Sequence, residues 1–181
     1  MKNFKFIIAL FFILVGVSLR LIPHAPNFTP IATIALFAGV YFSKKIALLL
    51  PVLAMLISDL FIGFYDFKLM AAVYGSFILC TIVGFWLKKH KKWNTITGAA
   101  FLSSAFFFVI TNFAVWAFSS WYAKSFSGLI QCYIMALPFL KNTLLGDLFY
   151  TTVFFGAYEL AIALVGKIFK EKKDDVVLVK I

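Results

Sequence analysis

Long apolar runs are the feature of this sequence that most restricts its fold. A helix needs about 20 predominantly apolar residues to cross a hydrocarbon core of about 30 Å. Hydrophobic residues make up 64% of the 181 residues and charged residues only 13%, a composition far outside the range of water-soluble domains. We therefore predict an all-α, polytopic transmembrane bundle of about six helices, at residues 4–21, 29–42, 46–64, 69–87, 95–118 and 144–168.

Two apolar segments fit this pattern less well than the others. Residues 29–42 are short for a crossing, so this helix is expected to tilt or to span only part of the membrane. Residues 127–140 contain Pro138 and are too short to count as a span, which leaves a re-entrant, an interfacial and a membrane-spanning placement open. No repeat or flexible linker divides the chain, so we expect one transmembrane bundle at residues 1–169 and a short cytoplasmic tail at residues 170–181.

The basic residues orient the predicted bundle. Cytoplasmic connections of membrane proteins carry an excess of Lys and Arg. When both termini are placed in the cytoplasm, most of the 17 Lys and Arg residues lie on that side, and the outer side keeps Arg20, Lys68, Lys124 and Lys141. Topology and contact with anionic membrane lipid then explain the net charge of +10, and no nucleic acid is expected as a partner. We expect a multi-pass protein of the bacterial inner (cytoplasmic) membrane.

A polar segment at residues 20–30, Arg-Leu-Ile-Pro-His-Ala-Pro-Asn-Phe-Thr-Pro, separates the first two apolar runs. Irregular polar backbone at membrane depth is tolerated where it is buried in protein or lines a wet cavity. This segment is therefore predicted to lie at the mouth of a binding site.

Further polar residues gather on the outer side in this topology. Ionisable side chains at membrane depth are costly, so by default they face the bundle interior and either pair or line a ligand path. Arg20 offers a planar fork for a carboxylate or phosphate, while Asp59 and Asp147 balance it or accept hydrogen bonds from a ligand. Alternatively, Arg20 pairs with one acid only to neutralise buried charge. Asparagines would orient polar edges of the ligand, and tryptophans would stack on a ring. The candidate substrate-binding residues are Arg20, His24, Asn27, Asp59, Asn112, Trp116, Trp121, Asn142 and Asp147.

Metal, cofactor and catalytic patterns are weak in this sequence. His24 lacks a partner histidine, and no HExxH, Walker or Gly-x-Ser-x-Gly motif is present. Cys80 and Cys132 fall at different predicted depths, so we expect no disulfide between them. We interpret Cys80 as a packing residue. The alternative is that its sulfur is a soft ligand to the metal of a bound cofactor. We predict no cofactor and no enzyme activity. A membrane-embedded hydrolase or transferase that uses His24, Asp59 and Asp147 is the alternative, as is a structural or regulatory subunit of a membrane complex.

Two further features concern the helices themselves. Glu159 falls near the middle of the last predicted helix, where we expect it to hydrogen-bond across the bundle or to couple to protons, although no second acid lies at relay spacing.

Small residues four positions apart let a neighbouring backbone approach closely and mark surfaces for internal packing or for docking another subunit. These pairs are Ala35 and Gly39, Ala99 and Ser103, Ala100 and Ser104, and Ala157 and Ala161.

Four segments give the chain a resemblance to a known group of proteins. They are residues 20–30, 55–59 (Met-Leu-Ile-Ser-Asp), 110–116 (Ile-Thr-Asn-Phe-Ala-Val-Trp) and 141–150 (Lys-Asn-Thr-Leu-Leu-Gly-Asp-Leu-Phe-Tyr). Together they resemble an uncharacterised family of small bacterial six-helix membrane proteins, and they extend from the first predicted helix to the last.

More distantly, the architecture resembles the S components of energy-coupling-factor vitamin transporters, six-helix proteins that bind a ligand near the outer face and dock an energising module. The resemblance implies capture of a vitamin-like or other small nutrient, and energising transporter subunits as partners. One branch of that superfamily carries cobalamin, whose cobalt a Cys80 thiolate would ligate. The Ala-x3-Ala docking pattern of that family is absent from the first helix, where Ile13 follows Ala9, so a solitary transporter is the alternative.

Overall fold

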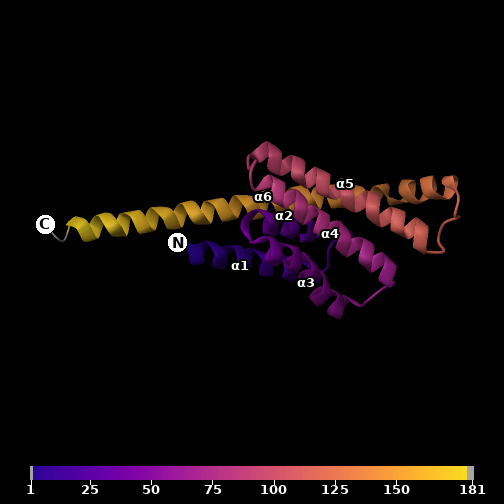
Figure 1. Cartoon of the computed structure of the whole chain (residues 1–181), viewed down its shortest axis with the longest axis horizontal. Helices are drawn as coiled ribbons and strands as arrows, with labels where there is room; N and C mark the ends of the chain where they lie inside the picture. The colour runs from indigo at the N-terminus through magenta and orange to yellow at the C-terminus, as the bar shows by residue number, and fades with distance from the viewer. Residues whose placement is uncertain (1, 179–181) are drawn as a thin grey trace.

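The structure, a computed structural model, describes residues 2–178, with side chains described at positions 6, 7, 10, 11 and 13–167. The described residues form helices joined by irregular connections and contain no strand, which confirms the predicted all-α fold. The helices run back and forth along one long axis (Figure 1). Their bounds are α1 Lys2–Leu21, α2 Ile31–Tyr41, α3 Lys44–Ile62, α4 Phe67–Leu87, α5 Trp93–Phe118 and α6 Phe126–Leu178.

Membrane-spanning character is clear in four helices of the described part of the chain. Helices α3, α4 and α5 and the segment Phe126–Lys167 of α6 are long and apolar enough to cross a membrane. Helix α2 is apolar but has only 11 residues. At a rise of 1.5 Å per residue it is about 16 Å long, about half of a hydrocarbon core. This length agrees with the expectation that the run is short for a crossing, and the six helices of the structure agree with the predicted bundle of about six.

The two ends of the bundle differ in charge. Figure 1 places the start of α1 and the end of α6 on one side of the molecule and the connections from α3 to α4 and from α5 to α6 on the opposite side. We call the end with the start of α1, the connection at residues 42–43 and the lysine-rich connection at residues 88–92 the inner end; Lys44 and Lys45 begin α3 at this end. The outer end holds the connections at residues 22–30, 63–66 and 119–125. This arrangement agrees with a topology in which both termini share the lysine-rich side.

Helix α2 forms the centre of the core. Each residue from Ile31 to Val40 is buried, and α2 packs against all five of the other helices. A helix that is apolar all round is stable when other elements cover it on every side. Aromatic contacts add to this packing, since the Phe37 ring lies edge-on to Phe155 with centroids 5.4 Å apart. The shortest helix is therefore the one around which the others are arranged.

Two glycines allow α2 and α4 to touch backbone to backbone. A Cβ atom added at Gly39 would lie 2.8 Å from the Cα atom of Gly84, and one added at Gly84 would lie 2.5 Å from the carbonyl oxygen of Leu36. No larger residue fits such an approach without a shift of the backbone. The small-residue pair Ala35 and Gly39 thus serves internal packing, one of the two roles predicted for it.

Helix α6 differs from the sequence-based prediction in its length. The segment at residues 127–140, which we did not count as a span, is the first part of α6 and continues without interruption through Pro138. The polar residues that follow are helical as well, and two of their side chains have hydrogen-bond partners. Thr143 donates to the carbonyl oxygen of Phe139, and Asn142 donates to a carbonyl of another segment. The helix also continues past the predicted boundary at residue 169 to Leu178, while residues 179–181 lie outside the described residues.

The contact between α2 and α4 gives a prediction about stability. Replacement of Gly84 by Ala should destabilise the bundle by about 1–3 kcal/mol because the added methyl group overpacks the crossing. The matched control is Gly75→Ala in the same helix, where an added Cβ meets no atom within 4 Å. Since Ala favours a helix over Gly by up to about 1 kcal/mol, this control should melt at the same temperature as the parent or higher. Thermal unfolding in detergent measures both, and equal melting of the two variants would contradict the close packing.

Candidate functional site

Two adjoining cavities lie in the outer half of the bundle. Their volumes are about 180 Å³ and about 30 Å³, and they share Asn27, Thr29, Phe77 and Phe107 as lining residues. We treat them together as the outer cavity. The larger part also reaches Arg20, Met55, Tyr65 and Val73, and the smaller part reaches Ala32, Thr143 and Asp147.

The irregular segment at residues 22–30 forms one wall of the outer cavity. Its central turn is closed by a hydrogen bond of 3.0 Å from the Phe28 amide to the Ala25 carbonyl. Pro26 and Asn27 occupy the two central positions, and Asn27 has a φ of 64°. This combination is typical of a type II turn, in which Pro presets the first central position and Asn tolerates the left-handed second one. The turn places the Asn27 amide beside the cavity.

Helix α6 holds this segment in position. The Asn142 side chain donates a hydrogen bond of 3.0 Å to the Pro26 carbonyl. One turn further along, a Cβ atom added at Gly146 would lie 3.2 Å from the Cα atom of Phe28, so the segment rests directly on the helix. The Phe28 ring packs against Tyr150 with centroids 5.4 Å apart. The Asn142 bond pairs one backbone carbonyl of the irregular segment, as polar backbone inside a membrane protein requires.

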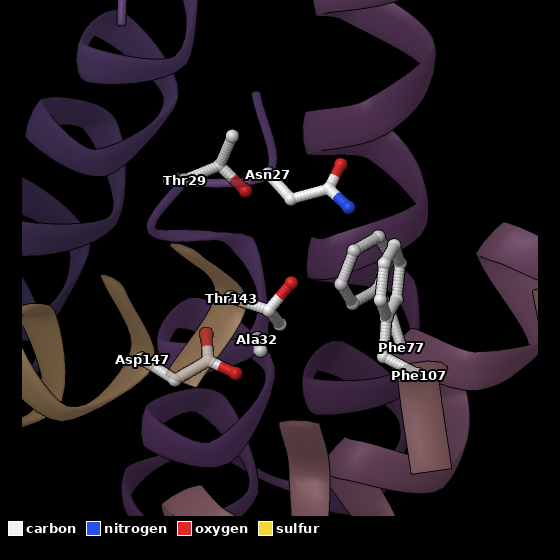
Figure 2. A pocket seen from close by; sticks show the side chains of 7 residues that line it. All are labelled: Asn27, Thr29, Ala32, Phe77, Phe107, Thr143 and Asp147. Atoms are coloured by element: carbon white, nitrogen blue, oxygen red, sulfur yellow. The ribbon is translucent and has the colours of Figure 1, made fainter. Parts of the chain in front are cut away.

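Two stacked rings form the apolar wall. Phe77 from α4 and Phe107 from α5 have ring centroids 5.2 Å apart and an interplanar angle of 27°. Figure 2 shows them side by side, across the cavity from Thr143 and Asp147 and below the Asn27 amide. Such a wall suits a flat apolar or aromatic surface of a ligand.

A guanidinium group lies at one end of the outer cavity and is partly neutralised. Arg20 donates to Asp59 over 2.9 Å and also to Ser58. Asp59 is almost fully buried, at 1% exposure, and its second oxygen accepts a hydrogen bond of 2.6 Å from the Tyr74 hydroxyl. Burial, with the nearby Asp59 charge, raises the pKa of Tyr65 to about 12, so Tyr65 lines this end as a neutral phenol.

A carboxyl group lies at the other end. Asp147 on α6 is 3% exposed, and it accepts a hydrogen bond of 2.5 Å from the Ser104 hydroxyl on α5. A carboxylate can accept about four hydrogen bonds, so the Ser104 contact leaves acceptor capacity. Figure 2 shows the Asp147 carboxyl group near Thr143, on the side of the cavity opposite the two rings. Asp147 can therefore receive a hydrogen bond from a bound molecule.

The structure brings five of the predicted residues to this site. Arg20, Asn27 and Asp147 line the cavity. Asp59 stands behind Arg20 as its ion-pair partner, and Asn142 supports the wall segment. Arg20 therefore does both things that the sequence suggested. It neutralises a buried acid, and it borders a cavity.

The other four predicted residues lie elsewhere. His24 is exposed, and its Nδ1 atom lies 2.6 Å from the Ile22 carbonyl oxygen. Asn112 donates to a carbonyl of its own helix. Trp116 donates to the Ala123 carbonyl near the α5 to α6 connection, and Trp121 in that connection is 75% exposed. None of these residues lines the described outer cavity.

Neither cysteine borders the outer cavity as described. Cys80 is fully buried between α4 and α5, with its sulfur 4.0 Å from the Ser103 carbonyl oxygen. Cys132 is buried near the Asn112 carbonyl. Both thiols are free, and the residues that the structure describes contain no cluster of three or more metal-ligating side chains.

Glu159 lies at the inner end rather than inside the bundle. It pairs with Lys91 and accepts a hydrogen bond of 2.7 Å from the Tyr41 hydroxyl. The predicted bond across the bundle is therefore present, and the carboxyl group has a cationic partner. At 46% side-chain exposure it is not the isolated buried acid that its sequence position suggested.

Sequence reasoning missed several lining residues. Phe77 and Phe107 gave no signal because the chain contains 24 Phe residues. Ser104 was interpreted only as a small packing residue. Thr29 lies inside the segment predicted to border the site, and Thr143 directly follows the predicted residue Asn142. Their positions in the sequence, rather than their residue type, could have indicated that they line the cavity.

The fold and site define a helical-bundle protein with four membrane-compatible helices and, in its outer half, a largely apolar cavity bordered by a few polar groups. Within that class, the chain belongs to the DUF6580 family, a family of unknown function whose model matches residues 1–170. The predicted membership in an uncharacterised family is thereby confirmed. No curated protein and no solved structure matches the chain.

The Arg20 and Asp59 pair gives a second prediction. Asp59→Asn should destabilise the protein by about 3–5 kcal/mol because it leaves a buried guanidinium without its counter-charge. The double variant Arg20→Gln, Asp59→Asn should recover part of this loss, since neither charge then remains unpaired. Asp66→Asn is the matched control, because Asp66 only caps α4 and Asn caps a helix as well as Asp does. Strictly additive losses in chemical or thermal unfolding would contradict the coupling.

Proposed function

We propose that this protein is a substrate-binding or transport protein of the bacterial cytoplasmic membrane, and that it captures a small nutrient in the outer cavity. The observation that carries the proposal is the distribution of polar groups around one hollow. Arg20 borders one end and Asp147 the other, and the stacked Phe77 and Phe107 rings lie between them. A few convergent polar groups in a largely apolar cavity are characteristic of small-molecule sites.

This arrangement favours a ligand with a flat ring and two polar ends. The Phe77 and Phe107 wall would pack on the ring. Asp147 would accept a hydrogen bond from an amino or other N–H group, and the remaining Arg20 donors would face a carboxylate or carbonyl oxygen. The Asn27 amide would bond to a polar edge. A vitamin-like compound that carries both donor and acceptor groups has this character.

The volume limits the size of the proposed ligand. The larger part of the outer cavity measures about 180 Å³, close to the roughly 150 Å³ of an engineered protein cavity that accepts benzene. A single-ring nutrient fits this space, whereas a corrinoid is many times larger. Since Cys80 is also outside the lining, we do not extend the proposal to cobalamin.

The likeness to S components of vitamin transporters supports capture at the outer face, and it brings energising subunits into the proposal as partners. The small-residue surfaces divide between packing and possible docking. Gly39 is used against α4, and Ser104 bonds to Asp147. Ala157 and Ala161 are half-buried on α6 and are the pair left available for another subunit.

We favour binding over catalysis because the acids are held in place by partners. Asp59 already bonds to Arg20 and Tyr74, which leaves it poorly placed to take a proton from a substrate. His24, the predicted third catalytic group, lies exposed and outside the cavity lining. Product formation by the purified protein would favour the enzyme alternative, and stable subunits without a small ligand would favour a structural role.

Ligand capture is tested first by native mass spectrometry of gently solubilised protein and by thermal shift against single-ring nutrients with amino and carboxylate groups. We expect a co-purified solute, or a compound of the panel that raises the melting temperature. If neither method finds a ligand for the parent protein, the proposal of capture is wrong.

The role of Asp147 is tested with that ligand. Asp147→Asn should weaken binding about tenfold or more, because a hydrogen bond to a charged group contributes about 1.5–3 kcal/mol. Glu159→Gln makes the same chemical change at the inner end, so it should leave the affinity unchanged. Unaltered binding by Asp147→Asn would remove Asp147 from the site.

Asn27 allows the turn and the ligand contact to be separated. Asn27→Gly keeps the left-handed backbone without steric cost but deletes the amide. We expect weaker ligand binding at nearly unchanged melting temperature. A variant that melts much lower would indicate that the Asn27 side chain supports the segment rather than the ligand.

A further inference from the structure

A second cavity of about 390 Å³ lies at the inner end of the bundle. It is larger than the outer cavity and falls in the usual range of about 300–1,000 Å³ for small-molecule sites. Its wall is apolar and aromatic and includes Phe6 from α1, Phe42 after α2 and Ile46 from α3. Ser43 and Lys88 also border it, together with Tyr41 and Tyr158. We call it the inner cavity.

The charge at the inner cavity is positive. Lys88 borders the space, and the described side chains include no acidic group within ion-pair distance of it. The nearest described ion pair on these connections joins Lys91 to Glu159, so the Glu159 charge is already offset. Lys44 and Lys45 follow Ser43 directly in the sequence and are exposed. An anion at this place would be attracted from several directions.

The start of α3 adds donors on the same side. Ser43 is the N-cap residue of this helix, and its side chain makes no capping hydrogen bond. The first N–H groups of a helix lack partners within it, and the helix dipole favours an anion there. A phosphate near Lys88 would therefore also find the Ser43 hydroxyl and these backbone groups.

Tryptophans mark the depth of the inner cavity. Trp86 at the end of α4 is 52% exposed, and Trp93 at the start of α5 is 55% exposed. Tryptophan concentrates at the boundary between hydrocarbon and headgroups, and these two residues flank the lysine-rich connection that contains Lys88. We therefore expect Lys88 at the level of lipid headgroups and the apolar wall at the level of the acyl chains.

We propose that the inner cavity binds an anionic phospholipid of the inner leaflet. Lys88, with Ser43, holds the headgroup phosphate, and an acyl chain lies along Phe6, Phe42 and Ile46. Basic pockets between membrane helices on the cytoplasmic side are suited to such headgroups. A soluble phosphate compound would find the same cationic group but would gain nothing from the apolar wall. The site is separate from the outer cavity and does not depend on the proposed ligand there.

The test is competition between phosphatidylglycerol and phosphatidylcholine for the full chain in mixed lipid nanodiscs, followed by native mass spectrometry of the retained lipid. We expect retention of phosphatidylglycerol in preference to phosphatidylcholine. Lys88→Gln should reduce this preference about fivefold, the effect of about one lysine near an anionic surface. Lys89→Gln removes the same charge from an exposed residue that does not border the cavity, and it should have little effect.

A second variant tests the apolar wall without changing charge. Ile46→Trp fills the inner cavity and should displace the lipid, whereas Leu49→Trp changes an exposed residue of the same helix outside the cavity lining and should not.

Equal loss from Lys88→Gln and Lys89→Gln would overturn the site, because only general surface charge would then be involved. Full displacement of the lipid by glycerol phosphate would assign the cavity to a soluble phosphate. Retention of another protein subunit in place of lipid would assign it to protein docking.

Discussion

The burial of α2 on every side is the constraint on which the rest of the structure depends. Its contact with α4 at Gly39 and Gly84 fixes its depth, and the other helices cover the remaining faces. Helix α2 is only about half as long as a hydrocarbon core is thick, and residues 22–30, which precede it on its outer side, have no regular structure. Their polar backbone needs protein partners at that depth, and α6 supplies them. The outer cavity is the space that this short helix leaves above it.

The charged groups around the outer cavity are fixed rather than free. Arg20 and Asp59 hold one another, and Tyr74 and Ser58 complete their hydrogen bonds. Buried pairs of this kind contribute little net stability, but loss of one partner is costly. Their effect is to place a guanidinium group at a defined point of a mostly apolar wall. The hydrogen bond from Ser104 places Asp147 in the same way. The polar groups of the cavity are therefore in position before a ligand binds.

Much of this structure could be predicted from the sequence, for reasons that differ between its parts. Apolar runs identified the helices because membrane insertion depends on local composition. The polar segment at residues 20–30 indicated the site because unpaired backbone in lipid is so unfavourable. The placement of residues 127–140 was left open between three alternatives, since the partner of Asn142 just beyond Pro138 comes from a segment more than 100 residues away.

The aromatic wall was missed for a related reason. Which of many phenylalanines meet in space depends on how α4 and α5 are rotated against each other, and a single sequence does not contain that information. Trp116 and Trp121 were predicted to stack on a ligand because tryptophan suits that role. They lie beyond the outer end of the cavity, because α5 extends past it. The sequence therefore predicted which segments are helical better than it predicted how far along each helix a given side chain lies from the cavity.

The length of α6 has a mechanical consequence. One uninterrupted helix carries Asp147 at the outer cavity and Glu159 at the inner end, and it continues to Leu178. Twelve positions separate the two acids, about 18 Å along the axis. Because the helix between them is continuous, α6 alone sets the distance from the Asp147 end of the outer cavity to the ion pair with Lys91.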